Sequence, residues 1–403
     1  MPRDRDPPSL FHLNSEICDL NLLYATSARL GGSGLDAVAA ETVRAAQRAR
    51  VLGRALAFEN RLPDLPAEQF ESLRWHPVRL LSALGSEHYY ATKKHALDRA
   101  AARRLAAGGF DLFHGWSGEC LRTLREARRL GVRSVIEIPT WHRHKGKAKP
   151  TRLTQSERER AAAAGWRGIK DRLLVTRQQV LEEYDLADLI LVLSQKAEET
   201  FLAAGIAPAK LFRHQRGVDV ARFTPAAGPP EKFRAVFVGA LIKRKGVHHL
   251  LQVWQRLGLS DAELVLVGTV HEEVRRYLDQ FAGDNVRLPG FVERVEDCYR
   301  EAAVHVFPSE CEGSAKATYE AAACGLPQIT TRESGDVVID QVNGLIIPPN
   351  DPEALAAALL QLYHDRDLAA RLGAAGRQRV VENFTWEHFG ARLLEAWRTA
   401  VSL

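Results

Sequence analysis

Residues 303–331, AVHVFPSECEGSAKATYEAAACGLPQITT, decide how the rest of the chain is interpreted. The apolar run at 304–307 predicts a buried strand, which a loop of small residues, a helix beginning near Ser314 and a second strand after 325–327 follow. A glycine at the mouth of a helix leaves backbone N–H groups unpaired at its positive end, and that arrangement suits a phosphate. The stretch therefore predicts an anion site near residues 313–316.

Two acids flank this predicted anion site. Glu312 and Glu320 are eight residues apart, about two helical turns, so the later acid is expected on the helix face that the earlier one caps. Their carboxylates could accept hydrogen bonds from two sets of hydroxyls, such as those of a sugar and a ribose. The alternative is that Glu312 is an ordinary N-terminal helix acid and Glu320 a solvated one.

The segments SECEG (309–313) and EAAACGLP (320–327) resemble the Glu, seven residues, Glu signature of the family-4 retaining glycosyltransferases, which have the GT-B fold. The resemblance implies that Glu312 contacts the donor sugar, that Glu320 contacts the ribose, and that loop amides hold the donor diphosphate. Those amides would belong to Gly313, Ser314 and Ala315, where the family usually has Gly-Phe-Gly. Lys316, which follows them, is predicted to add a phosphate or sugar contact or else to be a surface lysine.

A second basic element opens the latter half of the chain. A strand at 235–238 runs into Gly239, and Lys243, Arg244 and Lys245 precede a helix expected to start near 246. Three adjacent cations at a helix mouth need an anion or open solvent. The resemblance implies that Arg244 and Lys245 clamp the donor diphosphate. It also implies further donor contacts, namely the nucleobase at Phe291 and Val292 and the glycine loop at Gly31 and Gly32.

The first half carries the candidate acceptor-side residues. The strand FDLFHGW ends on His114 and Trp116, at the edge of a parallel sheet where ligands bind. The family commonly has His-x-His here, with the second His lining the sugar site. We therefore count His114 with Glu312 as a catalytic candidate and Trp116 as an acceptor-side candidate, while a packed core histidine is the alternative for His114.

A basic run follows the next predicted strand. TWHRHKGKAKPTRL (140–153) holds His142, His144 and Lys145 among its seven basic or imidazole side chains and has no acid. Such a run is expected to form an exposed loop. We predict that it grips a phosphate or other anion on the acceptor, or rests on anionic lipid, the alternative being a solvated loop with no partner.

Composition bounds the class of protein. The 403 residues, 46% hydrophobic and 26% charged, predict two globular domains. Residues 1–220 carry a net charge of +9 and residues 221–403 a net charge of −4; the basic half is the one expected to attract an anionic acceptor or membrane surface. No apolar run approaches a membrane span, the first residues do not resemble a signal peptide, and five scattered cysteines without a CxxC pair indicate a reducing cytoplasm.

The predicted fold is α/β, of the GT-B type, with two Rossmann-like doubly wound parallel-sheet domains facing across a cleft. We expect an acceptor domain at 1–220, a donor domain at 221–385, and a final helix at about 386–403 that crosses back to the N-terminal domain. The predicted reaction is transfer of a hexose-type sugar, with retention, from a nucleotide-diphosphate sugar to a hydroxyl of a glycan, a lipid-linked sugar or a small molecule. Neither a metal nor a cofactor is expected, because no DxD-type cluster stands near the donor residues.

Two other functions stay open on the sequence. A GT-B nucleotide-sugar epimerase would share the donor site, and a non-catalytic nucleotide-sugar or membrane-surface module would explain the departures at Trp116 and at Gly313-Ser314-Ala315. Nucleic-acid binding is not expected, because the basic residues are not interleaved with aromatic ones. The nucleobase, the sugar and the acceptor are not predicted.

Overall fold

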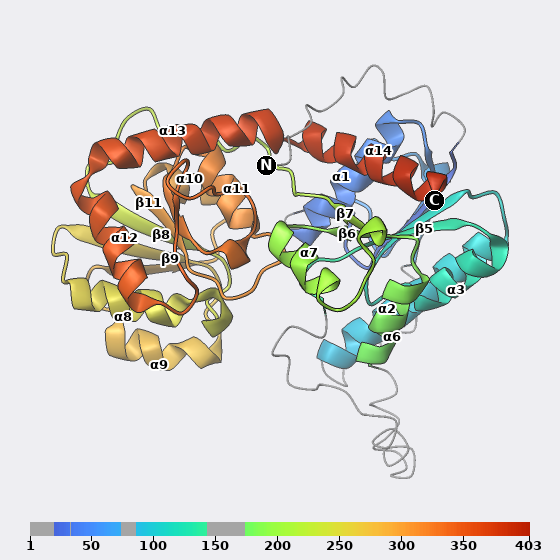
Figure 1. The fold of residues 1–403 in the computed structure, drawn as a ribbon, viewed down its shortest axis with the longest axis horizontal. Helices are drawn as coiled ribbons and strands as arrows, with labels where there is room; N and C mark the ends of the chain where they lie inside the picture. Colours follow the sequence, from blue (N-terminus) through green and yellow to red (C-terminus); the bar gives the residue numbers. More distant parts are fainter. Residues whose placement is uncertain (1–19, 33, 74–85, 143–173) are drawn as a thin grey trace, which may run out of the picture. The chain divides into compact units, whose positions relative to one another are not determined.

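The computed structural model describes residues 20–32, 34–73, 86–142 and 174–403, and the chain divides into two compact units. The first unit holds the described residues up to Val192 together with Thr200–His214 and Gly390–Leu403. The second holds Leu193–Glu199 and Gln215–Phe389. Each unit is an α/β structure built on one parallel sheet (Figure 1).

The N-terminal unit is built on a seven-stranded sheet in the order β3-β2-β1-β4-β5-β6-β7, and every pair is parallel. Reversal of the strand order beside the first strand is the hallmark of a doubly wound sheet. The strands are β1 (Leu22–Ala25), β2 (Leu52–Ala57), β3 (Phe70–Ser72), β4 (Leu112–Trp116), β5 (Arg133–Glu137), β6 (Leu189–Val192) and β7 (Leu211–Arg213).

Helices cover both faces of this sheet, as crossover connections between parallel strands require. In Figure 1, α2, α3 and α6 lie on one side of it, and α1 and α14 lie on the other. The helices are α1 (Leu35–Arg48), α2 (Ser86–Ala106), α3 (Leu121–Leu130) and α6 (Arg177–Leu186). Two further helices, α7 (Gln195–Leu202) and the final α14 (Trp386–Ser402), have residues in both units.

The C-terminal unit repeats the plan with six parallel strands in the order β10-β9-β8-β11-β12-β13. The strands are β8 (Phe233–Val238), β9 (Ala262–Val267), β10 (Val286–Gly290), β11 (Val304–Phe307), β12 (Gln328–Thr330) and β13 (Leu345–Ile346). The helices are α8 (Val247–Leu257), α9 (Glu272–Phe281), α10 (Val295–Arg300), α11 (Lys316–Ala323), α12 (Pro352–His364) and α13 (Arg366–Asn383).

Alternation along β8 explains why this second sheet is buried on both faces. Phe233, Ala235 and Phe237 face a core shared with α8, α9 and α12. Val236 and Val238 face a second core, which α10, α11 and α13 cover. Successive strand residues point to opposite sides of a sheet, so the sequence FRAVFV supplies both cores from one strand.

The final helix, α14, returns to the N-terminal unit, as the resemblance implies. Its residues from Gly390 onward belong to that unit, and Gly390 lies so close to α1 that a Cβ there would be 3.4 Å from the Cβ of Ala45. Further along the helix, Trp397 Nε1 donates to His114 Nδ1 on β4 at 3.2 Å. The last residues of the chain therefore complete the core of its first unit.

Among the described residues, no helix combines the length and the apolar character needed to cross a membrane.

Candidate functional site

The basic turn lies directly after β8, at the carboxyl edge of the second sheet. Residues Lys243–Lys245 form a single 3₁₀ turn, and Gly246 has φ 74° before α8 begins. Only glycine fits at 246, since a Cβ there would come within 2.2 Å of the carbonyl oxygen of Pro308. This contact presses the loop that follows β11 against the basic turn, so the two elements predicted to hold an anion adjoin within one unit.

Glu312 connects the two elements electrostatically. Its Oε1 lies 3.1 Å from Arg244 Nη1 and 3.9 Å from Lys245 Nζ. Arg244 also donates to the carbonyl of Cys311, and its own carbonyl accepts from the Glu310 amide at 2.8 Å. The loop bearing the first predicted donor acid is therefore held on the two cations predicted to clamp the diphosphate.

Lys245 is held more tightly than its neighbours on the turn. Its side chain is 17% exposed, against 46% for Arg244, and Nζ lies 5.2 Å from the centre of the Phe307 ring. Burial lowers the pKa of Lys245, and the Arg244 charge lowers it further, while Glu312 opposes both. Because Lys245 shares the Glu312 carboxylate with Arg244, its charge is only partly compensated and can bind a second anion such as a phosphate.

The start of the helix after the loop differs from the prediction. Helix α11 begins at Lys316, two residues later than the expected start near Ser314. The Ala315 amide donates to the carbonyl of Ser334 at 2.8 Å, so it is engaged within the protein and is not free for a phosphate. The first-turn amides of Lys316 and Ala317 replace it as the orphan donors of the helix.

The rest of that loop is fixed by Tyr319 and by residues farther away in the sequence. Arg216 Nε donates to the carbonyl of Ser314 at 2.9 Å, and the Ser314 hydroxyl bonds to Tyr319 Oη at 2.8 Å. The Glu312 amide donates to the carbonyl of Glu333 at 3.0 Å. Sequence reasoning missed Arg216 as a positioning residue, because its partner is a backbone carbonyl almost 100 residues away.

The second acid is buried and paired. Glu320 on α11 is 3% exposed, its Oε1 lies 2.6 Å from Lys316 Nζ, and its Oε2 accepts from Tyr299 Oη at 3.2 Å. Glu312 thus meets two cations of the basic turn, whereas Glu320 pairs with Lys316 at the start of α11. Burial, followed by the Glu320 charge, raises the pKa of Tyr299 well above its usual value, so its hydroxyl remains a donor.

The remaining predicted donor residues are dispersed over both units. Gly239 has φ 146°, and a Cβ there would lie 2.8 Å from Lys245 Nζ, so this glycine makes room for the lysine. Phe291 follows β10 and is 80% exposed, with Val292 beside it. Gly32, in the N-terminal unit, has φ 139° and lies between β1 and α1. Their contacts with a nucleotide sugar stay predictions.

His114 and Trp116 lie inside the N-terminal unit. His114 is fully buried, with its ring 5.3 Å from Tyr24 and 6.0 Å from Trp397, and burial lowers its pKa to about 3. Trp116 is 6% exposed and donates to Tyr24 Oη at 3.1 Å. These surroundings favour the alternative of a packed core histidine.

A substitution at His114 tests whether this histidine is a packed core side chain. Since its pKa is about 3 when folded and about 6.5 when unfolded, the neutral ring contributes stability above pH 6.5 that is lost as the pH falls toward 3. We expect His114→Phe to be destabilised at pH 7.5, because Trp397 loses its acceptor, but by about 2 kcal/mol less at pH 5.0. Urea unfolding at both pH values measures this, and a constant difference would contradict it.

Turnover measured on the same variant tests the catalytic interpretation, since loss of a catalytic histidine lowers the rate by orders of magnitude.

Of the acceptor-side candidates in the basic run, the structure describes His142. His142 is 3% exposed and packs between the rings of Tyr184 and Phe201, at 5.1 and 4.9 Å, and its amide donates to the Thr200 hydroxyl at 2.9 Å. It is therefore a core side chain in this structure. His144, Lys145 and the rest of the basic run lie outside the described residues.

Sequence reasoning also missed a cluster of potential metal ligands. One ligand atom each from His248, His249 and Glu310 lie within 4.8 Å of one another. Burial lowers the pKa of His248 to about 4, and the neighbouring His249 and Lys243 add to the effect. The adjacent His pair, which follows Lys245-Gly246 after one residue, was the signal that the sequence offered, because Glu310 joins it only through the fold.

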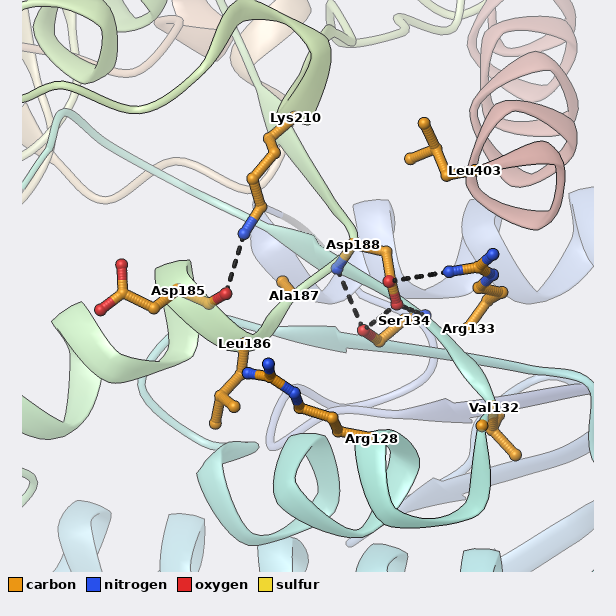
Figure 2. A pocket seen from close by; sticks show the side chains of 11 residues that line it. Arg128, Val132, Arg133, Ser134, Asp185, Leu186, Ala187, Asp188, Lys210 and Leu403 are labelled. Carbon is orange, nitrogen blue, oxygen red and sulfur yellow. Dashed lines mark hydrogen bonds and ion pairs between the residues drawn. The ribbon is translucent and has the colours of Figure 1, made fainter.

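A pocket of about 480 Å³ opens elsewhere, at the amino ends of β5 and β6 in the N-terminal unit. In Figure 2, Asp188 joins Ser134 and Arg133, while Lys210 reaches the backbone of Asp185. Ligands of open parallel sheets bind at the carboxyl ends of the strands, which is the opposite edge. None of the predicted site residues lines this pocket.

Comparison with known proteins matches the C-terminal unit to a family model. Residues 232–365 match the family described as glycosyl transferases group 1. The chain is 29% identical to the alpha-maltose-1-phosphate synthase of Mycolicibacterium smegmatis over 53% of its length. It is also 29% identical, over 54% of its length, to the GDP-mannose-dependent monoacylated alpha-(1-6)-phosphatidylinositol monomannoside mannosyltransferase of Corynebacterium glutamicum. In both cases the match spans 64% of the relative.

Among solved structures, HepE of Anabaena in complex with UDP resembles nearly the whole chain. The TM-score is 0.67 at 16% identity, and the likeness covers 95% of this chain and all of HepE. At this identity the likeness concerns the fold, and it confirms the predicted architecture of two Rossmann-like parallel-sheet domains.

Proposed function

Because this chain carries a glycosyl transferases group 1 domain, we propose that it transfers a hexose-type sugar from a nucleotide-diphosphate sugar to an acceptor hydroxyl, with retention of the anomeric configuration. The observation that carries the proposal is the convergence of Arg244, Lys245 and Glu312 beside the start of α11. Within one unit, the two cations of the basic turn would bind the diphosphate. The Glu312 carboxylate on the acid loop would accept hydrogen bonds from the sugar.

The chemistry follows from where charge develops. As the glycosidic bond breaks, the leaving nucleoside diphosphate gains negative charge, and fixed cations stabilise this charge more in the transition state than in the ground state. Arg244 and Lys245 supply two such cations, and the first-turn amides of α11 add the positive end of a helix. These groups neutralise the leaving group without a metal.

Glu312 has a dual part in this scheme. In the free protein it neutralises the two cations, and with donor bound it would accept hydrogen bonds from the sugar hydroxyls while the diphosphate takes over the cations. Glu320 would contact the ribose, while Lys316 stays its ion-pair partner on the same helix. We assign no protein nucleophile.

For the donor base and the acceptor, the relatives suggest what to test. HepE was solved with UDP, whereas the Corynebacterium relative is named for GDP-mannose and a phosphatidylinositol mannoside. The net charge of +9 over residues 1–220 suits an acceptor bearing a phosphate, free or on a lipid. We therefore propose an anionic acceptor bound by the N-terminal unit, with peripheral contact to anionic membrane if that acceptor is a lipid.

A donor screen tests the proposal. The full chain is incubated with UDP- and GDP-hexoses, first without acceptor and then with phosphorylated or lipid-linked acceptors. We expect slow release of nucleoside diphosphate from one donor and at least tenfold faster release with the right acceptor, together with a new glycoside. Conversion of the donor into an isomeric nucleotide sugar would indicate an epimerase instead, and calorimetric binding without turnover on any acceptor a binding module.

A further inference from the structure

We propose that His248, His249 and Glu310 form a binding site for a divalent metal ion of the zinc class, a site distinct from the donor contacts assigned above. The three side chains come from two elements. The histidines are the second and third residues of α8, and Glu310 lies in the loop after β11. One ligand atom from each lies within 4.8 Å of the others, a spacing that one ion in their midst can span with only small side-chain rotations.

The backbone holds these ligands together without a metal. The close approach of Pro308 to Gly246 sets the loop against the start of α8, and the Glu310 amide bonds to the carbonyl of Arg244 at 2.8 Å. The Ser309 hydroxyl donates to the same carbonyl at 3.2 Å. A site whose ligands are preorganised in this way loses little conformational entropy when it binds an ion.

Each of the two imidazoles has a buried Nδ1 atom that could bind a metal ion. His249 Nε2 lies 3.2 Å from Asn350 Oδ1. An amide oxygen can only accept, so this contact fixes the tautomer with the proton on Nε2 and leaves a lone pair on Nδ1. The Nδ1 atoms of His249 and His248 are both buried and without a hydrogen-bond partner in the described part of the chain. Buried unpaired ring nitrogens are costly unless something occupies them.

The ligand types of the cluster indicate the kind of ion. Hard ions such as Mg²⁺ and Ca²⁺ need several oxygen ligands, and this cluster offers oxygens from one carboxylate. Two imidazoles and one carboxylate instead match zinc, cobalt or nickel, and three protein ligands leave a fourth position for water or another oxygen.

An ion held here would tie the loop to the helix. Glu310 is two residues before Glu312 in the loop, so the metal would fasten the acid loop to the first turn of α8. This inference does not depend on the proposed function, because metal retention is measured without turnover. Its failure would leave the donor-site proposal intact.

The test measures binding of Co²⁺ and Zn²⁺ to the full chain, purified without a histidine tag and treated with chelator. We expect one Co²⁺ per chain, with a visible absorption band that Zn²⁺ abolishes. Glu310→Gln, which keeps the side-chain shape, and His249→Ala should each bind Zn²⁺ at least tenfold more weakly. His364→Ala is the matched control, because this histidine is exposed on α12 outside the cluster, and it should bind as the unmodified chain does.

Circular dichroism checks that each variant is folded. If His249→Ala does not fold, Glu310→Gln alone decides the test. The proposal is overturned if the unmodified chain takes up no stoichiometric ion, or if folded Glu310→Gln and His364→Ala bind Zn²⁺ with equal affinity.

Discussion

Lys245→Ala will lower the rate of donor turnover by about 10²–10³-fold, the usual cost of removing one preorganised charge-stabilising group. Lys245 is the less exposed of the two cations that meet Glu312, and it is held over the Phe307 ring, so a flexible neighbour cannot replace it. Release of nucleoside diphosphate, with and without acceptor, measures the loss. Lys243→Ala is the matched control, because Lys243 lies on the same turn but over the Tyr277 ring, and its rate should stay within a few-fold.

A pH profile checks that the charge of Lys245 is what matters. Because its pKa is lowered by burial, the cation is lost as the pH rises through a value below the ordinary 10.5, and kcat/KM for the donor should fall there. Arginine keeps its charge throughout this range, so Lys245→Arg should lack this alkaline decline at whatever rate it retains. An unchanged decline in that variant, or full activity in Lys245→Ala, would remove Lys245 from the proposed site.

The second large effect is expected at Glu312. Glu312→Gln should reduce kcat by about 10²–10³-fold, because the sugar loses a charged acceptor of hydrogen bonds. Binding of the nucleoside diphosphate alone should be as tight as before or tighter, since Arg244 and Lys245 are no longer neutralised by this carboxylate. Calorimetry with UDP and GDP beside the turnover assay measures both quantities.

The control for Glu312 is Glu353→Gln, which removes the carboxylate of an exposed ion pair with Arg256 outside the proposed donor site. This variant should change neither kcat nor the binding of nucleoside diphosphate. Loss of diphosphate binding in Glu312→Gln would mean that Glu312 only holds the loop in place. Retention of kcat would exclude it from contact with the sugar.

The sequence was sufficient for the fold because its strongest signals are local. Apolar runs such as 304–307 and the glycines that end them alternate with helical patterns, and the observed sheets are parallel in both units. The juxtaposition of the basic turn with the acid loop also agrees with the prediction. Both follow the carboxyl ends of adjacent strands, β8 and β11, which the parallel arrangement brings to one edge.

Features that depend on distant partners could not be predicted in this way. The start of α11 is set by the Ser334 carbonyl, which captures the Ala315 amide, and nothing near residue 315 announces that contact. His114 is predicted as a catalytic candidate at a strand end, but Trp397, 283 residues later, donates a hydrogen bond to its ring. His249 and Glu310 likewise meet only because β8 and β11 are neighbours.

The return of α14 has a consequence for biosynthesis. Domains generally fold in the order in which they leave the ribosome, at about 5–20 residues per second. Here the segment Gln215–Phe389 is synthesised before Gly390–Leu403, which the earlier unit still lacks at that point. Until Trp397 emerges, the indole that bonds to His114 is missing. The first unit therefore completes its core only after Gly390–Leu403 have been synthesised.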